Sequence, residues 1–264
     1  MWSHESLLYF WAMQVILSPA KNLNLELQPS WIPSGVPRFR EEAAVIMEHL
    51  SKKSSDDLKE LQQISQKLAQ LNYQRNQEWL PNGQGGKAAA LAFNGDVYQG
   101  LQAWQWNAED WEYAQRHLLI LSGLYGVLRP ADHIQPYRLE MGTNLKVADQ
   151  PDLYHFWQKP LEDYFKEELK EPALVNLASK EYARAFKQLD LNAPVLEVDF
   201  KEEYRGKFRV MSFYAKRARG KMANFIIQNR LEQLEELKAF ALDNYRFNPE
   251  LSTGDKFVFT RPKP

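Results

Sequence analysis

Apolar residues recur along the chain with two different periods, and each period predicts its own kind of element. Spacings of three and four residues predict amphipathic helices over 38–50, 56–79 and 153–169. Short unbroken apolar runs predict a buried strand over 14–17 and a buried strand or helix end over 118–121. Helix and strand patterns are therefore interleaved from the start of the chain.

Local signals mark the ends of several other elements. Asn107 is expected to begin a helix, because Asp110 follows it at the spacing of a capping box. Two β-rich arms, 195–204 and 207–214, are expected to pair as a hairpin about Gly206, since glycine tolerates a positive φ. Further expected elements are short apolar segments over 138–141 and 173–178, a helix over 215–230 and an edge strand over 256–261.

The order of these elements predicts the fold class. Strand and helix patterns alternate, and no repeat, low-complexity block or linker divides the chain. We therefore expect an α/β (α+β) fold, a single compact domain over 13–264 with a mixed β-sheet surrounded by helices. Met13 is a plausible start of this domain, which leaves residues 1–12 as an N-terminal extension.

The apolar run from Leu7 to Leu17 does not change this picture. It is too short and too interrupted to span a bilayer. No Lys or Arg precedes it, as one would in a signal peptide, and no clean cleavage site follows it. We therefore expect no association with a membrane.

Composition excludes several kinds of chemistry. The 264 residues are 44% hydrophobic and 25% charged, which is typical of a globular chain with a sizeable core. There is no cysteine, which excludes disulfides, thiolate metal sites and thiol nucleophiles. The five histidines show no metal-ligand spacing, so we expect neither a bound metal nor another cofactor.

The strongest local charge lies in the basic segment, Tyr204–Lys221, which holds seven Lys or Arg and no Asp or Glu. Its cations share one strand face and then open the next helix, where positive charge opposes the helix dipole. This pattern favours a bound anion over the alternative, pairing with Asp199, Glu202 and Glu203 on the other arm. The seven cations are Arg205, Lys207, Arg209, Lys216, Arg217, Arg219 and Lys221.

A second anion contact is expected near the N-terminus. Ser18 followed by proline is predicted to cap a helix, so that Lys21 in its first turn opposes the dipole and indicates a bound anion such as phosphate. The spacing of Ser18 and Lys21 also occurs in serine enzymes of the S-x-x-K type, but no partner motif accompanies it here. The glycine-rich stretch 82–87 lacks the spacing of a phosphate loop and is predicted to be a flexible connection.

The segment 121–130 contains two glycines around an apolar pair and is similar to a helix-hairpin-helix module. In such a module Gly123 and Gly126 would present bare backbone N–H groups to a phosphate without reading sequence. Pro130 departs from this pattern, because it would shorten the second helix. The alternative is an ordinary turn between buried segments.

Taken together, seven motifs in this order resemble the YaaA family of peroxide stress resistance proteins over the chain from about Val15 onward. They are Ser-Pro-Ala-Lys (18–21), Phe-Asn-Gly-Asp-Val-Tyr-Gln-Gly-Leu (93–101), Leu-Ser-Gly-Leu-Tyr-Gly-Val-Leu-Arg-Pro (121–130), Gln-Pro-Tyr-Arg-Leu-Glu-Met (135–141), Asp-Leu-Tyr-His-Phe-Trp (152–157), Asn-Leu-Ala-Ser-Lys-Glu-Tyr (176–182) and Ser-Phe-Tyr-Ala-Lys-Arg-Ala-Arg-Gly (212–220).

The resemblance implies a cytoplasmic protein that limits peroxide damage by lowering available iron inside the cell. It also implies a mixed α/β fold with a positively charged cleft that binds double-stranded DNA. We expect the contact to be independent of base sequence, and the protein to be a monomer. The residues assigned to DNA are Lys21, Gly123, Tyr125, Gly126, Arg129, Arg138, Lys216, Arg217, Arg219 and Lys221.

An enzyme is the alternative, because the motifs hold more polar residues than a simple DNA cleft requires. A closed polar pocket would favour catalysis on a small phosphorylated molecule, whereas an open groove as wide as a duplex would favour DNA. Direct storage of iron is disfavoured, since no histidine pair or Glu-x-x-His motif is present. The polar residues in question are Asp96, Tyr98, Arg138, Glu140, Asn176, Ser179 and Tyr182.

Overall fold

The computed structural model describes residues 13–81, 86–168, 173–187, 189–191 and 193–262. The proposed extension, residues 1–12, and most of the predicted connection over 82–87 lie outside the described residues.

The centre of the molecule is a mixed eight-stranded sheet in the order β11-β12-β9-β8-β1-β5-β6, with β10 paired to β9. Five neighbouring strands, from β12 to β5, run parallel, and β6, β10 and β11 pair antiparallel to their neighbours. The strands are β1 (Gln14–Leu17), β5 (Leu118–Ser122), β6 (Gly126–Leu128), β8 (Leu174–Asn176), β9 (Val195–Tyr204), β10 (Lys207–Arg209), β11 (Arg246–Phe247) and β12 (Lys256–Pro262).

The central strands are short and almost entirely apolar because both of their faces are covered. In β5 all five residues are buried, and β8 is buried throughout. Continuous apolar runs of this kind are typical of parallel sheets with helices on both faces. Two pairs of very short strands flank the sheet, namely β2 (Asn22–Leu23) with β4 (Phe93–Asn94) and β3 (Lys87–Ala88) with β7 (His133–Ile134).

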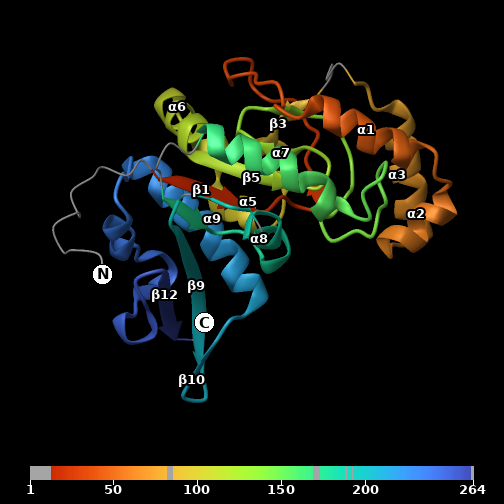
Figure 1. Cartoon of the computed structure of the whole chain (residues 1–264). Helices are drawn as coiled ribbons and strands as arrows, with labels where there is room; N and C mark the ends of the chain where they lie inside the picture. Colours follow the sequence, from red (N-terminus) through yellow and green to blue (C-terminus); the bar gives the residue numbers. More distant parts are fainter. Residues whose placement is uncertain (1–12, 82–85, 169–172, 188, 192, 263–264) are drawn as a thin grey trace.

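Helices surround this sheet, as Figure 1 shows, with α1 to α3 gathered on one side and the hairpin of β9 and β10 projecting away from the body. The α-helices are α1 (Arg40–Ser51), α2 (Ser55–Gln62), α3 (Gln66–Glu78), α4 (Ala89–Ala92), α5 (Asp96–Leu101), α6 (Ala108–His117), α7 (Leu153–Glu168), α8 (Lys180–Lys187) and α9 (Ser212–Asn229). The 3-10 helices are η1 (Ala103–Gln105), η2 (Leu234–Ala239), η3 (Leu242–Asn244) and η4 (Pro249–Leu251).

The mixed α/β class and most of the predicted elements are confirmed, but several boundaries differ. The single helix expected over 56–79 is two helices, because Gln63 takes a left-handed conformation and Ser65 caps a new helix. The helix expected from residue 215 begins at Ser212, so the second arm of the hairpin ends at Arg209. The strand β12 is not the edge, since β11 covers part of it.

The predicted helix-hairpin-helix segment is a β-hairpin. The strands β5 and β6 pair antiparallel around a turn at residues 123–125. Gly126 adopts a φ of +64°, and a Cβ atom there would lie 2.7 Å from the ring of Trp157. A Cβ atom on Gly123 would lie 2.6 Å from the carbonyl oxygen of Leu139. The two glycines therefore allow close packing inside the protein. The segment is an ordinary turn between buried segments, which was the alternative interpretation of the sequence.

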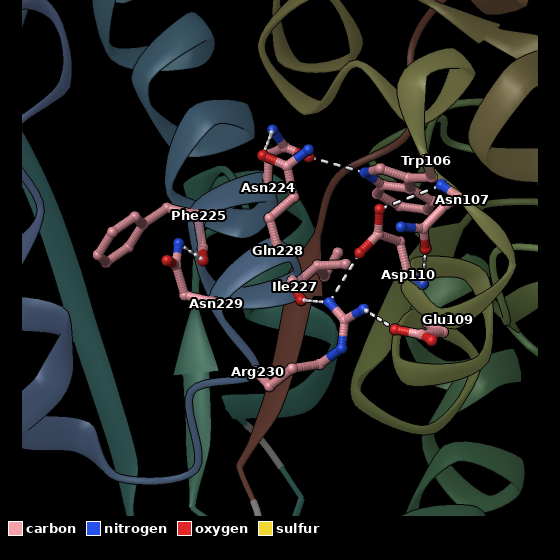
Figure 2. A network of polar contacts seen from close by, with 10 residues as sticks. All are labelled: Trp106, Asn107, Glu109, Asp110, Asn224, Phe225, Ile227, Gln228, Asn229 and Arg230. Atoms are coloured by element: carbon pink, nitrogen blue, oxygen red, sulfur yellow. Dashed lines mark hydrogen bonds and ion pairs between the residues drawn. The ribbon is translucent and has the colours of Figure 1, made fainter.

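Two contacts fix the long helix α9 in place. At its crossing with α5 the backbones touch, because Gly100 and Gly220 face the opposite helix. On another side, shown in Figure 2, the indole N–H of Trp106 donates to Asn224 Oδ1 at 2.7 Å. Arg230, just after the helix, donates to Asp110 Oδ1 at 2.7 Å. This anchoring sets the position of the cations that α9 carries.

Candidate functional site: a polar cavity at the carboxyl edge of the sheet

A cavity of about 450 Å³ lies where β1 and β8 end. From β1 the chain returns to the sheet as β5 on one side and as β8 on the other, so these strand ends form a switch point of the topology. In open parallel sheets such crevices are where ligands bind. Many of the side chains that line the cavity are polar. They include Ser18, Lys21, Asp96, Tyr137, Arg138, Glu140, Ser179, Tyr182, Lys216 and Arg219.

Hydrogen bonds across the strand ends build the floor of this cavity. The hydroxyl of Ser18 accepts from the backbone N–H of Ser179 at 2.8 Å, and the two serine hydroxyls lie 3.3 Å apart. The phenol of Tyr98, buried behind the wall, donates to the carbonyl of Ser18 at 3.0 Å. Asn176 in turn accepts from the N–H of Ala178 at 3.0 Å. The bonds between Ser18 and Ser179 hold the segment after β1 against the segment after β8.

The helix predicted to start at Ser18 does not form. The residues after β1 run as an irregular segment into β2, so Lys21 does not lie in a first helical turn. The dipole argument for an anion at Lys21 was therefore wrong. Its Nζ instead contacts Glu140 Oε2 at 2.6 Å.

Glu140 bridges two cations of the cavity. Besides Lys21 it receives Nη2 of Arg138 on its other oxygen, at 3.3 Å. The Lys21 side chain is 60% exposed, whereas those of Glu140 and Arg138 are 26% and 12% exposed. The inner part of this triad is thus largely shielded from water, which strengthens the attraction between its charges.

The other two cations of the cavity come from α9. Lys216 and Arg219 are three positions apart and so share one face of the helix. The Nε of Arg219 is buried without a hydrogen-bond partner among the described residues, and so is the Nε of Arg138. Burial lowers the pKa of the Arg219 guanidinium, while the charges of Asp199 and Glu197 oppose that shift.

Three tyrosines place neutral hydroxyl groups in or behind the wall. Burial raises the pKa of Tyr98, Tyr137 and Tyr182 well above the ordinary value, so all three stay protonated at neutral pH. The hydroxyl of Tyr137 is bonded to that of Ser122 at 2.7 Å, and Tyr182 accepts from the N–H of Met141 at 3.4 Å. They can donate hydrogen bonds but cannot serve as anionic bases.

The structure separates the ten residues assigned to DNA. Lys21, Arg138, Lys216 and Arg219 meet in the cavity. Arg217 is exposed on α9 without lining it. The remaining five lie elsewhere, and they are Gly123, Tyr125, Gly126, Arg129 and Lys221.

These five residues have internal partners. Tyr125 is 3% exposed, and its hydroxyl accepts from the indole N–H of Trp79 at 3.1 Å. Arg129 donates to the carbonyls of Gln115 and Arg116, both at 3.1 Å. Lys221 forms an ion pair with Asp243. Gly123 and Gly126 lie in the buried turn already described, so none of the five reaches the cavity.

A search for cations missed four further residues of the wall. Asn22, Asn94 and Tyr137 line the cavity, and so does Glu181, which accepts from the N–H of Gly142 at 2.9 Å. Three of these four stand inside the family motifs quoted above, at 93–101, 135–141 and 176–182. The motifs therefore contained the signal, which a search for cations alone passed over.

Outside the cavity, the hairpin carries a second group of cations. Arg205, Lys207 and Arg209 are exposed on it. Two of the three carboxylates considered as their partners are engaged elsewhere. Asp199 contacts Lys256 at 2.7 Å, and the buried Glu202 contacts Arg261 at 3.5 Å and accepts from the hydroxyl of Tyr245. The third, Glu203, is exposed on the same hairpin. The tip of the hairpin, residues 203–209, is thus exposed and carries more positive than negative charge.

Metal binding and membrane insertion are two further properties that bear on function. Among the described residues there is no group of three or more His, Asp or Glu placed to hold a metal ion. Over the same part of the chain, no helix is both long enough and apolar enough to cross a membrane.

Comparison with known proteins identifies the family. Residues 13–251 match the sequence model described as "Peroxide stress protein YaaA". A UPF0246 protein of Caulobacter vibrioides is 46% identical over 255 residues, which cover 96% of this chain and all of the relative. UPF0246 proteins of Marinomonas sp. (46%, covering 95% of this chain and 98% of the relative) and Albidiferax ferrireducens (45%, covering 96% and 99%) are similar. The chain therefore belongs to the peroxide stress protein YaaA family, also named UPF0246.

Proposed function

We propose that the cavity is the functional centre and that it binds a small anionic molecule, with a phosphate group as the best-fitting anion. The observation that carries this proposal is the convergence of four cationic side chains on one cavity at the carboxyl edge of a parallel sheet. Its volume of about 450 Å³ suits a small molecule and is far too small for a duplex. In this proposal the protein protects against peroxide by binding or converting that molecule.

The wall also offers groups for chemistry on the bound molecule. Asp96 and Glu140 are carboxylates within it, and Tyr182 supplies a protonated hydroxyl. A carboxylate beside a fixed donor is a common arrangement for acid–base catalysis. Catalysis on a small phosphorylated compound is therefore the activity that this geometry supports best.

Survival under peroxide tests the proposal in cells that lack the chromosomal gene. The change Arg219→Gln removes a cavity cation, and we expect it to abolish protection. Arg217→Gln makes the same change of charge on the same helix outside the cavity and should protect like the wild type. Full protection by Arg219→Gln at wild-type protein levels would overturn the proposal.

Duplex DNA is the second candidate ligand, and the exposed basic hairpin favours it. Arg205, Lys207 and Arg209 project into solvent, and Arg217 is exposed on the following helix. Cations in such a row bind phosphates of the backbone without reading bases. In this proposal DNA binds on the hairpin surface and not in the cavity.

Salt dependence tests this second candidate. If Lys207, Arg209 and Arg217 each contact a phosphate, the triple change to alanine should reduce the slope of log affinity against log salt by roughly 0.9 per contact. Unrelated sequences should lose affinity by a similar factor. An unchanged affinity and slope in a folded triple variant would exclude the hairpin as a DNA site.

We further propose that the protein acts in the cytoplasm and lowers free intracellular iron indirectly. Since the described residues contain no grouping suited to a metal, iron would respond to the reaction or the binding event and not to storage in this chain. Chelatable iron, measured by electron paramagnetic resonance in whole cells, should rise on loss of the gene. The Arg219→Gln variant should fail to restore it, whereas Arg217→Gln should succeed.

A further inference from the structure

The four cations of the cavity fall into two pairs with different surroundings. Lys21 and Arg138 lie on the segment after β1 and the segment after β7, and both are already in contact with Glu140. Lys216 and Arg219 project from α9, and neither makes an ion pair with a carboxylate in the part of the chain that the structure describes. The two pairs are therefore not equivalent anion sites.

The Lys21–Arg138 pair is already engaged within the protein, where one carboxylate contacts both cations. Glu140 takes one cation on each oxygen, and its contact with Lys21, at 2.6 Å, is short for a charge-assisted hydrogen bond. An anionic ligand could reach this pair only by displacing a carboxylate that is itself three-quarters buried. The triad thus keeps one net positive charge, but both of its cations already have a carboxylate partner.

The α9 pair differs from the first pair because neither of its cations has a carboxylate partner among the described residues. The Nε of Arg219 is buried there without a hydrogen-bond partner, as is the Nε of Arg138, and a buried unpaired donor on a cation is costly until an anion binds it. Asp199 and Glu197 lie near enough to favour its charge, but each already has a lysine partner, Lys256 and Lys187.

The start of α9 does not contribute to this site. The backbone N–H of its N-cap, Met211, donates to the buried carboxylate of Glu202 at 3.2 Å, and no residue from 211 to 215 lines the cavity. The attraction for an anion therefore comes from the two side-chain cations and not from the helix dipole.

We infer that the anionic group of the ligand binds to Lys216 and Arg219, while Glu140 holds Lys21 and Arg138, and that the other polar groups of the cavity receive an uncharged, hydroxyl-rich body. The carboxylates of Asp96 and Glu140 accept hydrogen bonds, as does Asn22 through its amide oxygen, and hydroxyl groups of a ligand are donors to such groups. The ligand class is thus a phosphate monoester of a polyhydroxy compound. This inference rests on the proposed small-anion site and specifies how that site is divided.

Binding of inorganic phosphate to the full chain, followed by isothermal titration calorimetry, separates the two pairs. We expect Lys216→Met and Arg219→Gln to weaken phosphate binding by on the order of tenfold or more, because each removes a charge-assisted bond. Lys21→Met should change it less than about threefold, and the matched control Lys67→Met, an exposed lysine on α3 outside both candidate sites, less than about twofold. Lys216 is exposed, so its variant keeps the experiment valid if Arg219→Gln does not fold.

Two further measurements test the role of Glu140 and the ligand class. Glu140→Gln should release Lys21 and Arg138, so that two phosphates bind per chain in place of one. Glucose 6-phosphate should bind the wild type more tightly than inorganic phosphate, since its hydroxyl groups would donate to Asp96, Glu140 and Asn22.

The outcomes distinguish the inference from the proposal beneath it. If neither probe binds the wild type, the small-anion site itself is refuted. If phosphate binds but Lys21→Met weakens it and the α9 variants do not, the cavity stands and the division is wrong. An unchanged stoichiometry in Glu140→Gln would show that Glu140 does not block Lys21 and Arg138. Equal affinity of the wild type for the two probes would show that the cavity does not bind the hydroxyl groups of the ligand.

Discussion

Gly220 makes one of the closest backbone approaches in the molecule. A Cβ atom at this position would lie 1.8 Å from the carbonyl oxygen of Val97, and one on Gly100 would lie 2.2 Å from that of Arg217. No side chain fits between the helices at these points. The approach fixes the height and rotation of α9, and hence the place of its cavity cations, against α5.

The change Gly220→Ala should therefore force the two helices apart. We expect the free energy of unfolding to fall by at least about 2 kcal/mol, because overpacking a closed contact outweighs the better helix propensity of alanine. Urea denaturation measures this. Gly254→Ala is the control, since a Cβ atom there meets nothing within 4 Å and should leave stability within about 0.5 kcal/mol. Equal stability of the two variants would contradict the close approach.

Asp132 gives a prediction for pH. Burial raises the pKa of its carboxyl from 3.8 to about 6, although the N–H of Arg129 donates to it at 2.8 Å. Between these values the folded chain binds more protons than the unfolded chain, so its contribution to stability is lost as pH rises from about 4 to about 6.

Asp132→Asn removes this titration. The stability of the variant relative to the wild type should therefore improve by roughly 2–3 kcal/mol between pH 4 and pH 7, since one pKa unit corresponds to about 1.4 kcal/mol. Chemical denaturation at a series of pH values gives the difference. A constant difference across the range would show that the Asp132 carboxyl titrates normally in the folded state.

At the scale of elements, the join between α6 and α9 depends on a few buried polar contacts. Trp106 and Asn224 are both buried, and their hydrogen bond closes the contact seen in Figure 2. Arg230 adds an ion pair with Asp110, whose carboxylate also completes the capping box with Asn107. One carboxylate thus both caps α6 and ties it to the end of α9.

Asn224→Ala leaves the indole N–H of Trp106 buried without an acceptor, so we expect a loss of about 1–3 kcal/mol in the free energy of unfolding. Asn229→Ala is a matched control on the same helix, because its side chain is exposed and bonds only to its own helix at Phe225. It should change stability by less than about 0.5 kcal/mol. If Asn229→Ala lowered the free energy of unfolding as much as Asn224→Ala, the loss could not be assigned to the hydrogen bond of the Trp106 indole.

Local sequence predicted those elements whose causes are local. The capping box at Asn107, the turn at Gly206 and the buried run of β5 all depend on neighbouring residues. The helix expected at Ser18 failed because its hydroxyl and carbonyl are bonded to Ser179 and Tyr98, 161 and 80 positions away. No local pattern records such partners.

The same reason limits what could be predicted of the site. The cations and carboxylates were identified as polar residues within motifs, but their division into a carboxylate-bound pair and an open pair depends on Glu140 meeting Lys21 across 119 positions of sequence. That contact exists only once β1, β7 and their neighbours are in place. Most polar residues of the cavity wall could therefore be identified from the sequence, but their roles depend on contacts that only the fold creates.

At the scale of the whole molecule, the sheet takes strands from both ends of the chain. Residues near 14 pair with residues near 118 and 174, and strands near 197 pair with those near 256. Because no part of the sheet can be removed without exposing the next strand, we expect a single cooperative unit.

Unfolding by urea should accordingly show one transition, with tryptophan fluorescence and far-ultraviolet circular dichroism giving the same midpoint. The midpoint should not depend on protein concentration if the protein is a monomer. Two separated transitions would divide the chain into independent units, and a midpoint that rises with concentration would indicate an oligomer.

Deleting residues 2–12 should leave the melting temperature essentially unchanged, because the family match begins at residue 13. Thermal denaturation of the shortened chain checks this. A large drop in melting temperature, or loss of well-folded protein, would show that these residues belong to the core.

The position of β1 in the middle of the sheet has a consequence during synthesis. Synthesis reaches this strand before its partners β5 and β8, and β8 emerges only after some 160 further residues, which takes on the order of ten seconds or more. Both edges of the apolar strand are unpaired until β5 emerges, one edge stays unpaired until β8 emerges, and until then the cavity beside Ser18 cannot exist. Premature termination before β8 would therefore release a fragment prone to aggregate, and a chaperone that shields the first strand would raise the yield of active protein.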